Sequence, residues 1–282
     1  MADECIHGFD DGLCAICFPP PVPEGLAAPT RTSSRSARVP GTRPRTAPSR
    51  TSPSSRVAGA SASRLDGPPI DAKALRIYHV THLDNLARIL GSGGLQADAG
   101  DPAAEPVVDI AAPAVREYRR SAVLSGTDQP IAAHVPFFLH IDALLWDAVR
   151  RGDADPRLVD GLAAGDFIVL VSTVGQAAGA RADTPGILAV ADGDPALPGA
   201  EVATEPQAIE RMLRLLARGD AEGLRAAELL VADHVALERF VLIAVPNEPV
   251  RDRVKRALDG IGVRTRVAVY PPWFQPALAP GA

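Results

Sequence analysis

The chain has 282 residues, of which 46% are hydrophobic, and a formal net charge of -5. This length allows one main domain of roughly 200 residues together with smaller accessory segments. The acidic balance argues against a uniformly basic nucleic-acid coat, and no apolar run approaches the roughly 20 residues that a membrane-spanning helix needs.

All three cysteines lie within the first 17 residues, in the stretch CIHGFDDGLCAIC. Cys5, His7, Cys14 and Cys17 follow a Cys-x-His, six-residue, Cys-x-x-Cys spacing, which supplies the four ligands of a tetrahedral zinc site. Because four protein ligands leave no position for a catalytic water, the zinc knuckle predicted over residues 1–18 is structural or adhesive. A chance cluster of cysteines is the alternative.

A disulfide framework is disfavoured because the number of cysteines is odd and because the first residues do not resemble a secretory signal. We therefore expect a cytoplasmic, reducing environment, in which thiolates can hold a metal ion.

Residues 19–70 are rich in Pro, Ser, Thr, Ala and Gly and have almost no aliphatic periodicity, which predicts a disordered linker. Between Pro29 and Gly67 this segment holds eight arginines and a single acid, Asp66. Two interpretations stay open. The segment is a solubilising linker with a biased composition, or it is an arm that attracts a polyanion such as nucleic acid through counterion release.

Residues 71–282 form the predicted ordered domain, which begins with a strand over 74–80 and a helix over 81–94. Further elements follow in chain order: a helix over 111–123, a strand over 134–141, a helix over 142–152, a strand over 166–174, a helix over 205–219, a strand over 239–245, a helix over 248–261 and a strand over 264–270. Helices and strands are mixed without strict alternation. The pattern predicts an α+β domain with a mixed, largely antiparallel sheet and flanking helices.

Common enzyme motifs are absent from the sequence, including the Gly-rich dinucleotide fingerprint, the phosphate-binding Gly-Lys-Ser loop, the Gly-x-Ser-x-Gly elbow and His-Glu-x-x-His. Polar residues instead stand at the edges of apolar strands, namely His79, Thr81, Arg119 and Glu228. Glu228 is the most informative, because a carboxylate beside the apolar run LLV is costly to bury without a partner.

Five stretches, YHVTHLDNLARILGSGGL, REYRR, HVPFFL, RAAELLVADHV and PPWF, occur in the order and spacing of the DarT family of nucleic-acid ADP-ribosyltransferases. The chain resembles this family from about Ala74 to Phe274. The resemblance implies an ADP-ribosyltransferase fold and NAD as a substrate. It implies that His79, Thr81 and Asn85 hold the nicotinamide-ribose half of NAD.

The resemblance also matches Glu228 to the catalytic glutamate and Arg119 to an arginine that serves the pyrophosphate or the transition state. Cleaving the glycosidic bond of NAD passes through an oxocarbenium-like ribose cation, which a carboxylate stabilises, and Glu228 can also accept a proton from the attacked base. The Arg119 guanidinium can bind a diphosphate through two hydrogen bonds. Phe137 and Phe138 are candidates for stacking on nicotinamide or on an unpaired base, with Phe138 assigned to the cofactor.

Each assignment has a structural alternative. His79 can be satisfied by the backbone at a strand end, and Arg116 or Arg120 can replace Arg119. Because Phe137 and Phe138 point to opposite faces of a strand, one of them is expected in the ordinary core.

The chain departs from the family at three places, with Ala226 where Gln is frequent, Phe138 where Tyr is frequent, and Ala133-His134 where Asp-Tyr is frequent. The position of Ala226, two residues before the glutamate, often bears on acceptor choice in such transferases. The acceptor therefore stays open between DNA, RNA and protein.

Two functions are compatible with the sequence. The first is an NAD-dependent ADP-ribosyltransferase that modifies a base in single-stranded DNA, acting as a toxin with a macrodomain antitoxin as partner. The second is an inactive transferase-like protein that binds nucleic acid or a protein through its zinc knuckle and basic segment. The joint presence of His79, Arg119 and Glu228 favours the first.

Overall fold

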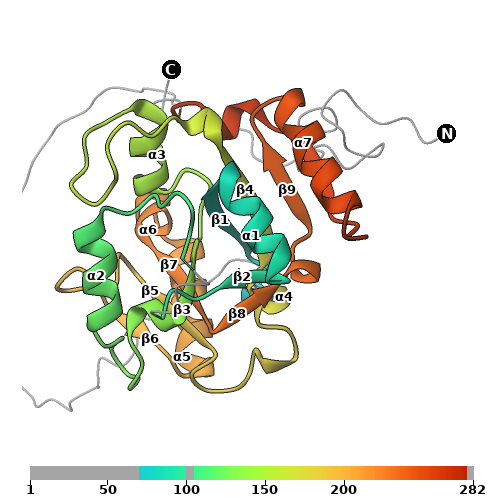
Figure 1. Ribbon diagram of the computed structural model, residues 1–282. Coiled ribbons are helices and arrows are strands. Elements are labelled where there is room, and N and C mark those ends of the chain that lie inside the picture. Colours follow the sequence, from blue (N-terminus) through green and yellow to red (C-terminus); the bar gives the residue numbers. More distant parts are fainter. Residues whose placement is uncertain (1–69, 100–104, 278–282) are drawn as a thin grey trace, which may run out of the picture. The chain divides into compact units, whose positions relative to one another are not determined.

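A mixed sheet of eight strands organises the part of the chain that the structure, a computed structural model, describes: residues 70–99 and 105–277 (Figure 1). Its strand order is β10-β9-β4-β1-β3-β7-β5-β6, and a separate two-stranded sheet pairs β2 with β8. The predicted zinc ligands Cys5, His7, Cys14 and Cys17 and the predicted linker up to residue 69 lie outside the described residues.

The paired strands run antiparallel, with the exception of the parallel pair β9 and β10. The strands are β1 (Arg76–His82), β2 (Gly94–Gln96), β3 (His134–Phe138), β4 (Phe167–Thr173), β5 (Leu188–Ala191), β6 (Val202–Ala203), β7 (Glu228–Ala232), β8 (His234–Ala236), β9 (Leu242–Val245) and β10 (Arg266–Val269). The prediction of an α+β domain with a largely antiparallel sheet is confirmed.

Helices cover both faces of the sheet. They are α1 (Leu86–Gly91), α2 (Pro113–Ser121), α3 (Leu144–Arg151), α4 (Val174–Ala178), α5 (Pro206–Arg218), α6 (Ala221–Ala226) and α7 (Glu248–Asp259). The largest core joins one face of the sheet to α1, α4, α5 and α7, and a second core joins the other face to α3 and Phe274. Side chains therefore pack against both faces of the central strands.

Strand β4 illustrates why the sequence folds in this way. Its residues alternate between the two cores, with Ile168 and Leu170 in the larger one and Val169 and Val171 in the smaller one. Successive side chains of a strand point to opposite faces, so a strand that is buried on both faces needs a continuous apolar run. The run FIVLV supplies it.

The structure corrects several predicted boundaries and adds elements. The strand predicted over 134–141 ends at Phe138, and the helix predicted over 81–94 is limited to α1. Thr81 and His82 belong to strand β1 and not to the following helix, which starts as a 3-10 turn over Leu83–Asn85. His82 caps this turn, because its ring accepts a hydrogen bond from the backbone N–H of Asp84 at 3.2 Å. Strands β2, β5, β6 and β8 and helices α4 and α6 are not among the predicted elements.

Candidate active site

A cavity opens where strands β1 and β3 separate. The two strands pair at a single position, Tyr78 with Phe138, whereas β1 pairs with β4 and β3 pairs with β7 along their whole lengths. The gap is lined from both sides by residues of β1 and β3, and it encloses a cavity of about 240 Å³. The fold thus creates a cavity in the middle of a sheet whose other strands are packed against side chains on both faces.

All six predicted catalytic and cofactor-binding residues line this one cavity: His79, Thr81, Asn85, Arg119, Phe138 and Glu228. They come from β1, the turn before α1, α2, β3 and β7. Their convergence is observed, whereas their individual roles stay predictions.

Strand register places Glu228 beside two aromatic residues. Glu228, the first residue of β7, is directly opposite Phe138 of β3, which is directly opposite Tyr78 of β1. Directly opposite residues point to the same face, so the three side chains form a row across the sheet. The half-buried Phe138 lines the cavity, whereas Phe137 is 1% exposed and belongs to the core on the opposite face. The expectation that one of the pair is core is confirmed.

Arg119 and Glu228 form a buried ion pair. Arg119 Nη2 lies 2.9 Å from Glu228 Oε2, and Arg119 Nη1 lies 3.3 Å from Asp194 Oδ1. The exposed fractions of the Arg119 and Glu228 side chains are 17% and 8%. Burial opposes the charge of Arg119, yet the two carboxylates hold its pKa above the ordinary value. The guanidinium is therefore already engaged by carboxylates, which favours a part in the transition state over a grip on the diphosphate.

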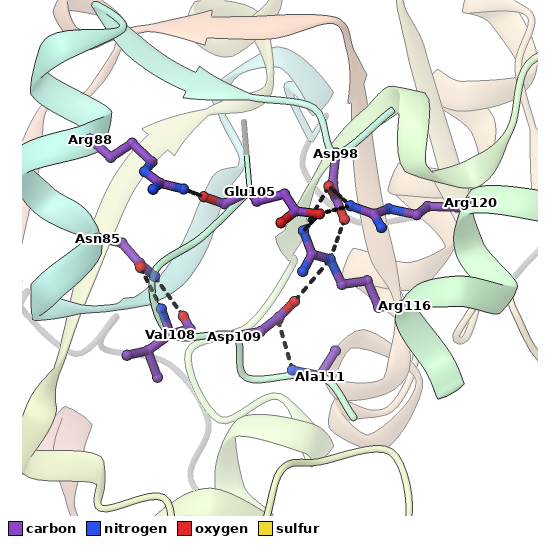
Figure 2. Close-up of polar contacts among 9 residues, drawn as sticks. All are labelled: Asn85, Arg88, Asp98, Glu105, Val108, Asp109, Ala111, Arg116 and Arg120. Carbon is purple, nitrogen blue, oxygen red and sulfur yellow. Dashed lines mark hydrogen bonds and ion pairs between the residues drawn. The ribbon is translucent and has the colours of Figure 1, made fainter. Parts of the chain in front are cut away.

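The other two arginines of α2 are engaged elsewhere. Figure 2 shows Asp98 lying between the guanidinium groups of Arg116 and Arg120, at 2.6 and 2.8 Å. Arg120 also binds Glu105 at 2.7 Å. Of the three candidates in the REYRR stretch, Arg119 is the one that contacts Glu228.

His79 is neutral at physiological pH. Its Nδ1 lies 2.9 Å from the carbonyl oxygen of Pro136, across the gap between β1 and β3. Burial lowers the pKa of His79 to about 4. The hydrogen bond with Pro136 acts in the opposite direction but is the smaller effect. Because a carbonyl can only accept, Nδ1 carries the proton and Nε2 is an acceptor. The backbone alternative thus accounts for one ring nitrogen and leaves the other for a ligand in the cavity.

Asn85 holds one wall of the cavity in place. Its side chain makes two hydrogen bonds with the backbone of Val108, accepting from the N–H at 2.9 Å and donating to the carbonyl at 2.8 Å (Figure 2). It also donates to Thr81 Oγ1 at 3.0 Å. Both amide hydrogens of Asn85 are thereby used, so we expect it to act on a ligand through the wall segment, residues 105–112, that it fixes.

Two further charged residues line the cavity, and no pattern in the sequence predicts them as site residues. Asp194, in the loop after β5, links Arg119 to Arg157, whose Nη1 lies 4.0 Å from Asp194 Oδ2. Asp194 and Arg157 both line the cavity. Each is a polar residue in a loop, where no periodic pattern distinguishes a site residue from a solvated one.

Within residues 70–99 and 105–277, no group of three or more His, Cys, Asp or Glu side chains could hold a metal ion. In the same described residues, none of the helices combines the length and the apolar character that crossing a membrane requires.

Comparison with known proteins gives concordant matches. The family model "ssDNA thymidine ADP-ribosyltransferase, DarT" matches residues 78–275. Proteins of Mycobacterium bovis and Mycobacterium tuberculosis, both named "DNA ADP-ribosyl transferase", are 27% identical over 216 residues, which cover 69% of this chain and 86% of theirs.

Solved structures of Thermus sp. 2.9 DarT share the fold. The complex with ADP-ribosylated single-stranded DNA has a TM-score of 0.57 and 23% identity, and covers 71% of this chain and 96% of that one. The complex with NAD+ has a TM-score of 0.55 and 22% identity, and covers 71% and 98%. At this identity the structural likeness extends to the fold alone.

Proposed function

The chain belongs to the DarT family of single-stranded DNA thymidine ADP-ribosyltransferases, and we propose that the Arg119–Glu228 pair of its cavity carries the transfer. It is an NAD-dependent enzyme that moves ADP-ribose onto a nucleobase of single-stranded DNA. The observation that supports the assignment is this buried ion pair, which lies in a cavity that also contains His79.

The reaction breaks the bond between nicotinamide and C1′ of the attached ribose, and the bonding electrons leave with nicotinamide. The ribose carbon becomes cationic in the transition state. Glu228, Asp194 and Asp155 bring three negative charges against the positive charges of Arg119 and Arg157, which leaves a net charge of -1. A fixed negative cluster of this kind stabilises the developing cation, because it needs no reorganisation during the reaction.

The acceptor in thymidine is a ring nitrogen that bears a proton. As this nitrogen bonds to C1′, its proton has to leave, and we assign Glu228 as the carboxylate that receives it. Arg119 holds the carboxylate in the orientation that both tasks need. Its contact with Asp194 fixes the guanidinium from the other side.

His79 is suited to bind a ribose hydroxyl. His79 lines the cavity, its Nε2 is an acceptor because Nδ1 donates to Pro136, and its low pKa keeps the ring neutral. A hydroxyl hydrogen can therefore be donated to it over the whole physiological pH range. Phe138, in the row with Glu228, offers an aromatic surface for nicotinamide or for the acceptor base.

An intact Arg119–Glu228 pair argues against the inactive binding protein. Arg119, Glu228 and His79 converge on one cavity, which a binding protein acting through its N-terminal segments would not need. In this chain the carboxylate has an arginine partner, and His79 of the same cavity uses Nδ1 for the Pro136 carbonyl.

The N-terminal segments are assigned from the sequence. Cys5, His7, Cys14 and Cys17 bind one structural zinc ion, because their spacing supplies four ligands. The arginines between Pro29 and Gly67 add salt-dependent affinity for the DNA strand. The enzyme acts as a toxin whose modification is removed by a macrodomain antitoxin, as the family resemblance implies.

The test is incubation of the protein with NAD labelled in the adenylate part. We expect the label on a single-stranded oligonucleotide that contains thymidine. An oligonucleotide of the same length without thymidine, the matching duplex, RNA and carrier protein serve as competing acceptors. Label on protein or RNA in preference to thymidine would refute the assigned acceptor, and no turnover with any acceptor would favour the binding protein.

A further inference from the structure

Helix α2 carries Arg119 but has little apolar packing of its own. None of its nine residues is buried. Main-chain hydrogen bonds hold its two ends, from Ala112 to the carbonyl of Arg157 at 2.8 Å and from Ile131 to the carbonyl of Ala122 at 2.9 Å. Helices of globular domains are usually fixed by an apolar face, which α2 lacks. The rotation of α2 about its own axis, which decides where Arg119 points, therefore depends on polar side chains.

Two arginines of α2, Arg116 and Arg120, lie four positions apart and thus on the same side of the helix. Arg116 Nε and Nη2 donate to the two carboxylate oxygens of Asp98 at 2.6 and 2.9 Å. Arg120 Nη2 donates to Asp98 at 2.8 Å and to Glu105 at 2.7 Å (Figure 2). Burial opposes the charge of Asp98, yet the hydrogen bonds from both arginines hold its pKa below the ordinary value. These four residues, the α2 clamp, form a partly buried network that fixes geometry better than an isolated surface ion pair.

The α2 clamp attaches the helix to the wall segment of the catalytic cavity. Figure 2 shows Glu105, the first residue of this segment, between α1 and α2: its carbonyl accepts a hydrogen bond from Arg88, and its carboxylate binds Arg120. Asn85 holds the same segment at Val108. The wall segment therefore has two anchors that do not involve α2. Loss of Arg120 should free the helix more than it frees the wall.

We propose that Arg120 is a positioning residue of the transfer reaction, which through the α2 clamp fixes the rotation of α2 and so holds Arg119 against Glu228. The inference rests on the proposed function and adds to it a residue that does not line the cavity, unlike Arg116 and Arg119 on the same helix. Any effect of Arg120 on the reaction therefore has to pass through another residue. Successive side chains of a helix point about 100° apart, so a helix that is held on the Arg120 side presents Arg119 in one direction.

The first experiment measures transfer kinetics of Arg120→Gln in the full chain with labelled NAD and a thymidine-containing single strand. Misplacing a catalytic group by about 1 Å can lower a rate by about 100-fold, and Arg119 keeps its own carboxylate contacts, so we expect kcat to fall by about tenfold. The KM for NAD should change by less than about threefold, because the wall segment keeps its other anchors. Arg120→Lys should lose less, since an ammonium group still reaches one carboxylate. Asp183→Asn, which removes an exposed ion pair with Lys73, is the control and should match the parent.

A double-mutant cycle with Arg119→Lys separates positioning from a general loss of stability. If Arg120 acts through Arg119, Arg120→Gln should lower kcat about tenfold in the parent but less than about twofold in the Arg119→Lys background. A merely stabilising residue would lower the folded fraction in both backgrounds alike, and the number of NAD sites per chain, measured by calorimetry, reports that fraction. Losses that multiply in the double variant would overturn the proposal.

The second experiment does not depend on turnover. The Nε–H NMR signal of Arg119, identified by its loss in Arg119→Lys, reports the surroundings of the guanidinium without NAD or DNA. Arg120→Gln should shift this signal, and so should Asp98→Asn, which weakens the α2 clamp from a residue distant in the chain, whereas Asp183→Asn should not. An unchanged signal in both clamp variants would overturn the proposal. A shifted signal in a protein whose parent transfers no label would contradict the proposed function but support the link between Arg120 and Arg119.

Discussion

Arg119 Nη2 donates to Glu228 Oε2 at 2.9 Å although the two residues are 109 positions apart in the chain. One comes from α2, in the connection between β2 and β3, and the other begins β7. The pair is nearly buried, and removing one partner of a buried pair leaves the other charge uncompensated. This ion pair therefore makes the charge balance and orientation of the Glu228 carboxylate depend on the position of α2.

Arg119→Lys should lower the rate of transfer more than the affinity for NAD. A single ammonium group cannot contact Glu228 and Asp194 in the way that the planar guanidinium does. We expect kcat to fall by about 10- to 100-fold, somewhat less than for complete loss of a preorganised group. Calorimetry measures NAD binding, and Arg214→Lys, at an exposed ion pair on α5, is the control. A large loss of NAD affinity at unchanged kcat would instead assign Arg119 to the diphosphate.

His79 should make the domain less stable in acid. Its pKa is about 4 in the folded protein and about 6.5 in the unfolded chain, so between these values the unfolded chain binds more protons. The stability that the neutral ring contributes is present above pH 6.5 and is lost as the pH falls towards 4. Urea unfolding at pH 7 and pH 5 should show a smaller decrease for His79→Gln than for the parent. Equal decreases in the two proteins would contradict the assignment.

Asp147 should be important for the stability of the segment that precedes Glu228. Its side chain, 5% exposed, binds Arg150 at 2.8 Å and Arg225 at 3.1 Å, so it joins α3 to α6. Asp147→Asn removes the charge between these arginines and should reduce the free energy of unfolding by about 3 kcal/mol. Asp153→Asn, at an exposed position of the same region, should change it by less than about 0.5 kcal/mol. Equal unfolding midpoints would refute this.

Long periodic segments made much of the fold predictable. The apolar run of β4 and the amphipathic pattern of α5 each specify one kind of element. Strand β5, with the sequence LAVA, was missed because it is short and lies among Gly, Pro and Asp residues that indicate turns. The polar residues before Leu83 are typical of a helix start and predict a helix from Thr81, whereas pairing with β4 keeps Thr81 in a strand.

The site was predictable only in part, and for a different reason. Periodicity shows that Glu228 is at the edge of an apolar strand, but not that β7 lies next to β3. The expectation that Arg119 and Glu228 share a site came from resemblance to a family. Asp194 and Arg157 are not predictable as site residues, because their place in the site depends on contacts between segments distant in the chain, which no local pattern indicates.

Purified protein should carry about one zinc ion per chain, since four ligands at this spacing saturate one tetrahedral site. Cys14→Ser combined with Cys17→Ser should remove the metal and leave the thermal unfolding of the catalytic domain unchanged. Metal content is measured by mass spectrometry and unfolding by circular dichroism. Loss of the cooperative unfolding transition together with the metal would show that the knuckle and the domain are not independent.

Glu228→Gln tests the central claim most directly. The amide keeps the size and much of the hydrogen bonding of the side chain but removes its negative charge. The initial rate of labelled ADP-ribose transfer to a thymidine-containing single strand should fall by roughly 100- to 1000-fold, while NAD affinity stays close to that of the parent. The melting temperature should fall, because the buried Arg119 then keeps only Asp194 as a charged partner, so rates are compared at a temperature where both proteins are folded. Glu238→Gln, at an exposed position, should transfer at the parental rate. Transfer by Glu228→Gln as fast as by the parent would contradict the assignment of Glu228 as the catalytic carboxylate.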